Sequence, residues 1–242
     1  MLALTRGPER LLKSFSRRIG CLHDAPEAQK IAAQWLEEGG WLSEVENFNE
    51  LGQTLFDNIA PVDPEATLKC IERAVARGPA LFEKSDLNRS RFIHLLRALA
   101  YEPRLFDRAL RILIGLSGNA EPSNNSGEAI NVFKSMFMIT LSGTHAPATQ
   151  RAAFLLHLAQ SDSERNVKLV LAGLDAMLEC SHFSSSYGFE FGARKRDYGF
   201  HPGTHEEVRD WFGTAFDLCQ RLGPIYLTSH DREIRGGRPQ LP

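Results

Sequence analysis

Residues 92–116 read FIHLLRALAYEPRLFDRALRILIGL, and this stretch decides the fold class. Its first half repeats large apolar residues at intervals of three and four: Phe92, Leu95, Leu96 and Leu99. That spacing places them on one face of an α-helix. Glu102-Pro103 ends the first pattern, and a second helical pattern continues to Leu116. The stretch therefore predicts two antiparallel helices joined by a turn.

The same pattern occurs about forty residues earlier, within the period of HEAT-like helix pairs. There Leu55-x-x-x-Ile59-Ala60 precedes Pro64 as Leu95-x-x-x-Leu99-Ala100 precedes Pro103, and Asp63 is the expected N-cap residue. A weaker third copy runs from Phe154 to Leu178. We therefore expect an all-α protein of about nine or ten helices, built as stacked antiparallel helix pairs in a HEAT/TPR-like α-solenoid with one long aromatic and glycine-rich loop.

The remaining helical patterns complete the predicted organisation. A helix from Pro8 to Cys21 carries Glu9, Leu11, Leu12, Phe15 and Ile19 at amphipathic spacing, which favours a structural helix over a transit peptide. A helix over 130–141 is apolar nearly all round and is expected at the centre of the stack. Thr204 with Glu207 forms a capping box that starts a last helix to Leu222. We expect one domain over 1–222, with 1–47 as a candidate subregion, and an extended or disordered tail over 223–242.

Composition excludes several classes of protein. The 242 residues contain 28 Lys and Arg against 30 Asp and Glu, so the net charge of −2 gives no general attraction to polyanions. Hydrophobic residues make up 43% and charged residues 24%, as in globular proteins, and no membrane span is expected. Cys21, Cys70, Cys180 and Cys219 form no Cys-x-x-Cys pair, which favours free thiols in a reducing, cytoplasmic setting.

The segment from Phe183 to Gly203 interrupts the helical pattern. It combines six aromatic side chains and four glycines with the basic run Arg194-Lys195-Arg196. Such a composition favours a loop that recognises a protein partner or a neighbouring domain. The residues predicted to bind are Tyr187, Phe189, Arg194, Lys195, Arg196, Tyr198 and His201.

Two other interpretations of this loop remain open. Its aromatic residues could fold back and cover an end of the helical stack, in a purely structural role. Its charges and rings would also suit single-stranded nucleic acid. If the basic run binds a partner, replacing its three residues with alanine should weaken capture of that partner in a pull-down. The same change should alter the free energy of unfolding by less than about 1 kcal/mol.

The sequence contains no common catalytic or phosphate-binding motif, and no cofactor is predicted. A metal site could be imagined from Cys180, His182, His201, His205 and Cys219, but their spacing argues against one. The alternative function is a small hydrolase or transferase built from the 183–205 loop. Its titrating groups would be Asp197, His201 and His205, with Tyr198 or Arg194 binding substrate.

Four segments together show a resemblance to a known protein family. They are Leu95 to Leu116, the Asn-rich loop after it, Val132-Phe133-Lys134 leading to Thr144 and Arg151, and Arg196-Asp197-Tyr198-Gly199. This combination resembles the helical region downstream of the nucleotide-binding domain in large bacterial STAND-type NTPases, many of which are associated with antiphage defence. The resemblance covers roughly Leu51 to Leu222, rests on packing motifs, and transfers no catalytic residue because the phosphate-binding loop is missing. It implies a bacterial, cytoplasmic scaffold that senses or relays the binding of a partner.

Overall fold

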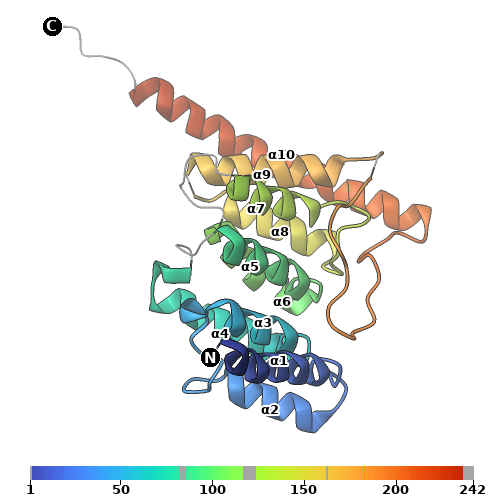
Figure 1. The fold of residues 1–242 in the computed structure, drawn as a ribbon. Helices are drawn as coiled ribbons and strands as arrows, with labels where there is room; N and C mark the ends of the chain where they lie inside the picture. Colours follow the sequence, from blue (N-terminus) through green and yellow to red (C-terminus); the bar gives the residue numbers. More distant parts are fainter. Residues whose placement is uncertain (1, 82–85, 117–123, 162, 182, 237–242) are drawn as a thin grey trace, which may run out of the picture. The chain divides into compact units, whose positions relative to one another are not determined.

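The computed structural model of the chain describes residues 2–81, 86–116, 124–161, 163–181 and 183–236. All named elements within these ranges are helical, which confirms the all-α prediction (Figure 1). Besides two short 3₁₀ helices, Val45–Asn47 and Pro79–Leu81, the α-helices are α1 (Leu2–Ile19), α2 (Pro26–Leu36), α3 (Glu50–Ile59), α4 (Pro64–Arg77), α5 (Asp86–Leu99), α6 (Pro103–Leu116), α7 (Asn124–Ser135), α8 (Ala148–Leu158), α9 (Glu164–Leu178) and α10 (His205–Gly236). In the part of the chain that is described, no helix has the length and apolar character needed to cross a bilayer.

The chain divides into two compact units, whereas the sequence predicted one domain over 1–222. Unit 1 comprises Met1–Val132 together with Tyr187–Asp197, and unit 2 comprises Phe133–Ser186 together with Tyr198–Pro242. The aromatic loop is therefore shared, because its central part packs with the N-terminal helices. We call this part, residues 187–197, the strap.

In unit 1, α5 packs against α6 as predicted, α3 contacts α5 and α4 contacts α6. Asp63 caps α4 as expected, since its Oδ1 accepts the Ala66 amide at 2.9 Å and Pro64 occupies the first turn. The rings of Phe56 and Phe92, both fully buried, lie 6.3 Å apart and join α3 to α5. These apolar contacts place the core between the helix pairs, as the 3.6-residue pattern requires.

Helix α1 packs differently from the prediction. It begins at Leu2 rather than Pro8, and its close contacts with α3 include the small residues Ser16 and, just after the helix, Gly20. The Asn58 amide donates to the Ser16 hydroxyl at 2.9 Å, and a Cβ on Gly20 would lie 2.3 Å from the Asn58 carbonyl oxygen. Such a close approach requires glycine. Of the residues at the predicted amphipathic spacing, Leu11 and Phe15 consequently face solvent, whereas Ile19 is half-buried.

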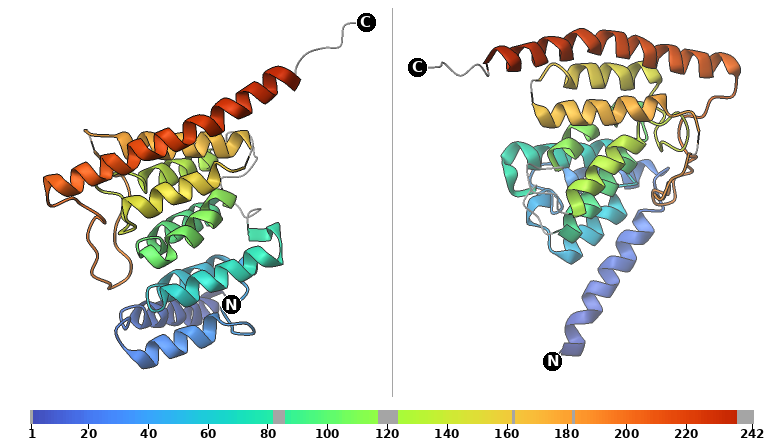
Figure 2. Two further views of the ribbon diagram at one scale, coloured as in Figure 1. Left: turned by 180° about the vertical axis from the view of Figure 1, so that it is seen from behind. Right: turned by 90° about the horizontal axis from the view of Figure 1, so that it is seen from above.

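Unit 2 consists mainly of α8, α9 and α10, which all contact one another (Figure 2). The buried Trp211 of α10 stacks on Phe200 and donates its indole N–H to the Met177 carbonyl at 2.8 Å. The predicted capping box is confirmed, because Thr204 and Glu207 bond each other's amides at 3.2 and 3.0 Å. The prediction of an extended tail from residue 223 is wrong up to Gly236, where α10 ends, while residues 237–242 lie outside the described ranges.

The predicted helix over 130–141 is displaced, because α7 has 12 residues but begins at Asn124 and ends at Ser135. The fully buried Arg151 of α8 explains this end. Its guanidinium donates to the carbonyls of Met136, Met138 and Ala146 at 2.8 to 2.9 Å. A helix continuing to Leu141 would use the Met136 carbonyl in its own ladder. Burial lowers the pKa of Arg151, and the surrounding carbonyl oxygens compensate for its desolvation.

Replacing Arg151 with methionine should destabilise the protein strongly. The substitution keeps much of the side-chain volume but leaves several buried carbonyls without a donor, at an expected cost of about 3–5 kcal/mol. Urea denaturation monitored by Trp fluorescence measures the loss. Arg209→Met, at an exposed position of α10, is the control and should change stability by less than about 0.5 kcal/mol. Equal effects of the two substitutions would contradict the role given to Arg151.

Candidate partner-binding site

The strap begins as an extended segment whose aromatic residues face α5. Tyr187, Phe189 and Phe191 occur at every second position, so an extended backbone directs them to one side. Arg97, in the last turn of α5, lies between the first two rings, with its Cζ 5.0 Å from the centroid of Tyr187 and 4.9 Å from that of Phe189. Its Nη1 donates to the Gly188 carbonyl at 2.8 Å. Arg97 is only 4% exposed, and burial lowers its pKa to about 10.

A second arginine makes the reciprocal contact from the strap to the helix. The Cζ of Arg196 lies 4.3 Å from the ring centroid of Phe191 and 4.4 Å from that of Tyr101. Its Nη1 donates to the Ala98 carbonyl at 2.6 Å, within the last turn of α5. Burial lowers the pKa of Arg196 to about 10. Cation–π contacts and carbonyl hydrogen bonds together fix the strap on α5.

The strap reverses direction between Phe191 and Arg194, whose backbone N–H donates back to the Phe191 carbonyl at 3.2 Å. Gly192 in this turn has φ +58°, and a Cβ there would lie 2.7 Å from the Pro61 ring. The position therefore requires glycine for both its conformation and its space. The Arg194 guanidinium donates to the carbonyls of Pro61 and Val62, which follow α3. The turn is thus attached to the segment that follows α3.

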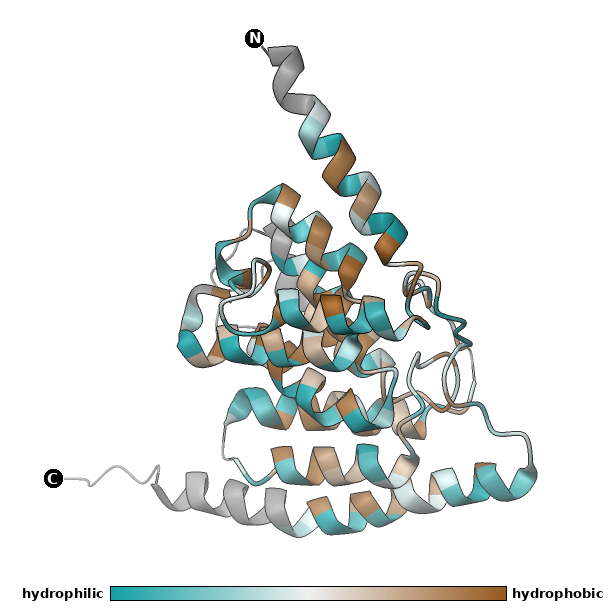
Figure 3. Cartoon of the chain, turned by 90° about the horizontal axis from the view of Figure 1, so that it is seen from below, coloured by the Kyte–Doolittle hydropathy of each residue, from teal (hydrophilic) through white to brown (hydrophobic). Residues whose placement is uncertain are grey.

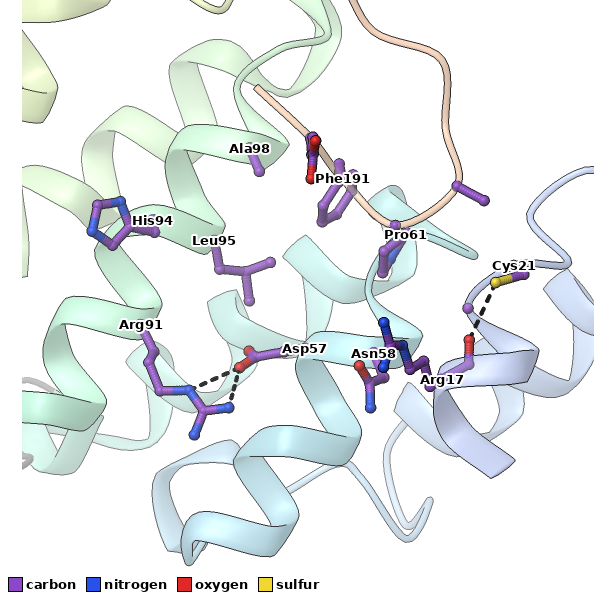
Figure 4. A pocket seen from close by; sticks show the side chains of 14 residues that line it. Arg17, Cys21, Asp57, Asn58, Pro61, Arg91, His94, Leu95, Ala98 and Phe191 are labelled. Atoms are coloured by element: carbon purple, nitrogen blue, oxygen red, sulfur yellow. Dashed lines mark hydrogen bonds and ion pairs between the residues drawn. The ribbon is translucent and has the colours of Figure 1, made fainter. Parts of the chain in front are cut away.

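The strap, α1, α3 and α5 together line an open cavity of about 600 Å³ within unit 1 (Figure 4). Phe191, Leu95 and Pro61 form part of an apolar wall. Charged and polar side chains line the rest: Arg17, Asp57, Asn58, Arg91, His94 and Glu190. The cavity has the size of a ligand pocket but is more polar than most.

An ion pair joins two helices at this cavity. Arg91 of α5 donates to the Asp57 carboxylate of α3 at 2.7 and 2.9 Å, and the Gln53 amide donates to the other carboxylate oxygen at 2.8 Å. Burial raises the pKa of Asp57, and the hydrogen bonds of Gln53 and Arg91 oppose that rise. Arg17 and Glu190 are exposed at the cavity, so its lining presents groups of both signs to solvent.

The predicted binding residues fall into different environments. Arg194 and Arg196 use their guanidinium groups inside unit 1, whereas Lys195 between them is exposed. Tyr187 and Phe189 are half-buried against Arg97, in agreement with the structural interpretation of the loop. In unit 2, Tyr198 is 62% exposed and His201 is also exposed.

The residues predicted for the hydrolase or transferase alternative also lie in different environments. The Asp197 carboxylate of unit 1 accepts the Tyr101 hydroxyl at 3.1 Å, while His201 and His205 are exposed in unit 2. None of these residues lines the cavity. In the described part of the chain, no three His, Cys, Asp or Glu side chains are grouped for a metal ion, and His182 lies outside that part.

Sequence reasoning missed the cavity itself. Asp57, Arg91 and Glu190 come from three distant segments, and no spacing pattern links them. The alternating aromatics of 187–191 were a usable signal, because period-two spacing in a loop indicates an extended segment with one packed side. No protein-family model matches the chain, and neither the curated proteins nor the solved structures give a significant match.

The strap offers a matched pair of neighbouring positions for a stability test. Arg196→Ala removes a hydrogen bond and two ring contacts, and should lower the free energy of unfolding by about 2–3 kcal/mol. Lys195→Ala, one residue away and exposed, should change it by less than about 0.5 kcal/mol. Thermal and urea denaturation measure both values. If Arg196→Ala left the free energy of unfolding nearly unchanged, the expectation from the sequence that the basic run is an exposed surface would hold instead.

Two cysteines of unit 1 differ in their exposure, and their reactivity can test it. Burial raises the pKa of Cys70 to about 11, whereas Cys21 lies exposed beside the cavity. In a Cys180→Ser/Cys219→Ser variant, a disulfide reagent at pH 8 should therefore modify Cys21 within minutes and Cys70 only after unfolding, because the thiolate is the reactive form. Absorbance of the released thiolate follows both reactions. Similar rates for the two thiols in the folded protein would contradict this assignment.

Proposed function

We propose that this chain is a non-catalytic helical scaffold that binds a protein partner, or a neighbouring domain of a larger assembly, through the cavity under the strap. The observation that carries the proposal is the fixed wall of this cavity. Phe191 is held by Arg196, and the turn beside it is held by Arg194 on the carbonyls after α3. A partner would meet a preformed surface and would lose little free energy in ordering it.

The chemistry of the lining favours a protein partner over an apolar small molecule. Arg17 and Glu190 offer exposed charges of opposite sign, and the His94 side chain is about half exposed while bonded to Glu128 at 2.9 Å. Apolar anchors surrounded by mixed charges are typical of protein–protein interfaces, in which aromatic residues and arginine contribute most of the affinity. A protruding side chain or a short peptide segment would fit this arrangement.

Two features support the more specific proposal of a HEAT-like scaffold in the bacterial cytoplasm. The contacts of α3 with α5 and of α4 with α6 are those expected when one helix pair stacks on the next. The resemblance of the segment from Leu95 to Leu116 to STAND-type NTPases further suggests that the chain acts as a sensor or relay in antiphage defence. In that setting the partner would be a nucleotide-binding domain.

The proposal can be tested by filling the cavity. Ala193→Trp places an indole at an exposed position that lines the cavity, and Ala76→Trp is the control on the exposed side of α4. Tagged wild-type and variant chains are expressed at equal levels in the native cell, and captured proteins are quantified by mass spectrometry. We expect a partner enriched by the wild type and by Ala76→Trp to fall at least about tenfold with Ala193→Trp, since blocking an anchor pocket removes dominant contacts.

Two results would contradict this function. Unchanged capture by Ala193→Trp would separate the cavity from partner binding. A small molecule that purifies with the wild type and is turned over by it would instead support the hydrolase or transferase alternative.

A further inference from the structure

Helix α1 exposes a stripe of large apolar side chains. Leu11 is 73% exposed and Phe15 is 59% exposed, and their separation of four residues places them on one side of the helix. Leu22, just beyond the end of the helix, is also exposed, and Leu12, four residues before Ser16, is 42% exposed beside the face that contacts α3. Several exposed neighbours of this kind differ from the single apolar residues that any surface carries.

The stripe is a consequence of how α1 is attached. Ser16 and Gly20 occupy the face that contacts α3, so the apolar residues cannot turn inward without breaking the close approach to Asn58. The N-terminal half of α1 extends beyond the other helices of unit 1 (Figures 2 and 3). The hydropathy colouring shows apolar positions along this extended part (Figure 3). A helix held in this way presents its stripe in a fixed orientation.

The charges beside the stripe indicate which kind of partner surface it could bind. From residue 7 to residue 20, the basic residues are Arg10, Lys13, Arg17 and Arg18, against the single acidic residue Glu9. Arg18 follows Leu11 by seven residues and therefore lies on the same side of the helix. A second copy of α1 would place arginines against arginines, which is unfavourable. Acidic side chains of a partner would instead form ion pairs with these arginines.

We propose that the exposed face of α1 is a docking site for an amphipathic helix of a partner protein, with acidic residues flanking its apolar anchors. Anchors at intervals of three and four residues would pack on Leu11 and Phe15, and glutamates or aspartates would pair with Arg10 and Arg18. The arginine in line with the stripe favours a protein over a membrane surface, because a partner can place a carboxylate there, whereas acyl chains cannot. This surface goes beyond the function proposed for the cavity and does not depend on it.

The probe for this site is a synthetic helical peptide of about 18 residues, long enough to form several turns. It carries leucines at i, i+3, i+4 and i+7 and glutamates elsewhere, and a twin peptide has lysines in place of the glutamates. Binding of each labelled peptide to the full chain is measured by fluorescence anisotropy at low and high salt. We expect saturable binding of the acidic peptide alone, weakened by salt.

The variants separate the apolar and charged contributions. Leu11→Ser/Phe15→Ser should weaken binding of the acidic peptide at least about tenfold. Leu171→Ser, at a half-exposed leucine of α9, should leave it unchanged. Arg10→Glu/Arg18→Glu should reverse the preference in favour of the lysine peptide. Because the changed positions are exposed, circular dichroism melting should show unchanged stability in each variant.

Several results would overturn the proposal. These are failure of the acidic peptide to bind, equal binding of both peptides, and binding that survives the serine substitutions. Dimerisation abolished by Leu11→Ser/Phe15→Ser would assign the stripe to a second copy. Binding to phosphatidylserine vesicles in place of the acidic peptide would assign it to a membrane. Ala193→Trp should leave peptide binding intact, so failure of the cavity proposal and failure of this one are distinguishable.

Discussion

The candidate site depends on the contact between two arginines and the aromatic rings on either side of them. Arg97 of α5 lies between Tyr187 and Phe189, and Arg196 of the strap lies between Phe191 and Tyr101. The strap has almost no regular backbone pairing of its own, apart from one bridge at its turn. Its position is therefore determined by side chains, and so is one wall of the cavity.

These two arginines belong to a wider use of arginine in the chain. Helix ends leave carbonyls without partners, and a guanidinium from another element can supply the missing donors. Arg89 donates to the Leu116 carbonyl at the end of α6, Arg73 donates to that of Leu36 at the end of α2, and Arg151 serves the turns after α7. Arginine suits this role because its planar group has five donors and remains charged when partly buried. Many arginines are thus engaged within the fold, and fewer are exposed than the composition suggests.

Unit 1 consequently offers two surfaces of different character. The cavity combines a fixed apolar wall with charges of both signs, whereas α1 combines an exposed apolar stripe with positive charge. Both arise from small residues at close contacts, because Gly192 admits the strap turn beside Pro61 and Gly20 admits α1 beside Asn58. Under the proposed function, two such surfaces would allow contact with one extended partner or with two separate partners.

The sequence by itself determined the helical class, the packing of α5 on α6, and the caps at Asp63 and Thr204, because each depends on residues close to one another in the chain. It did not determine which side of α1 is buried, since periodicity identifies an apolar stripe but not whether another helix covers it. It also gave the wrong ends for α7 and α10, where Arg151 and continued helix formation decide the boundaries. The cavity was decided by tertiary structure alone, because Asp57, Arg91 and Glu190 meet only after segments more than 130 residues apart have packed together.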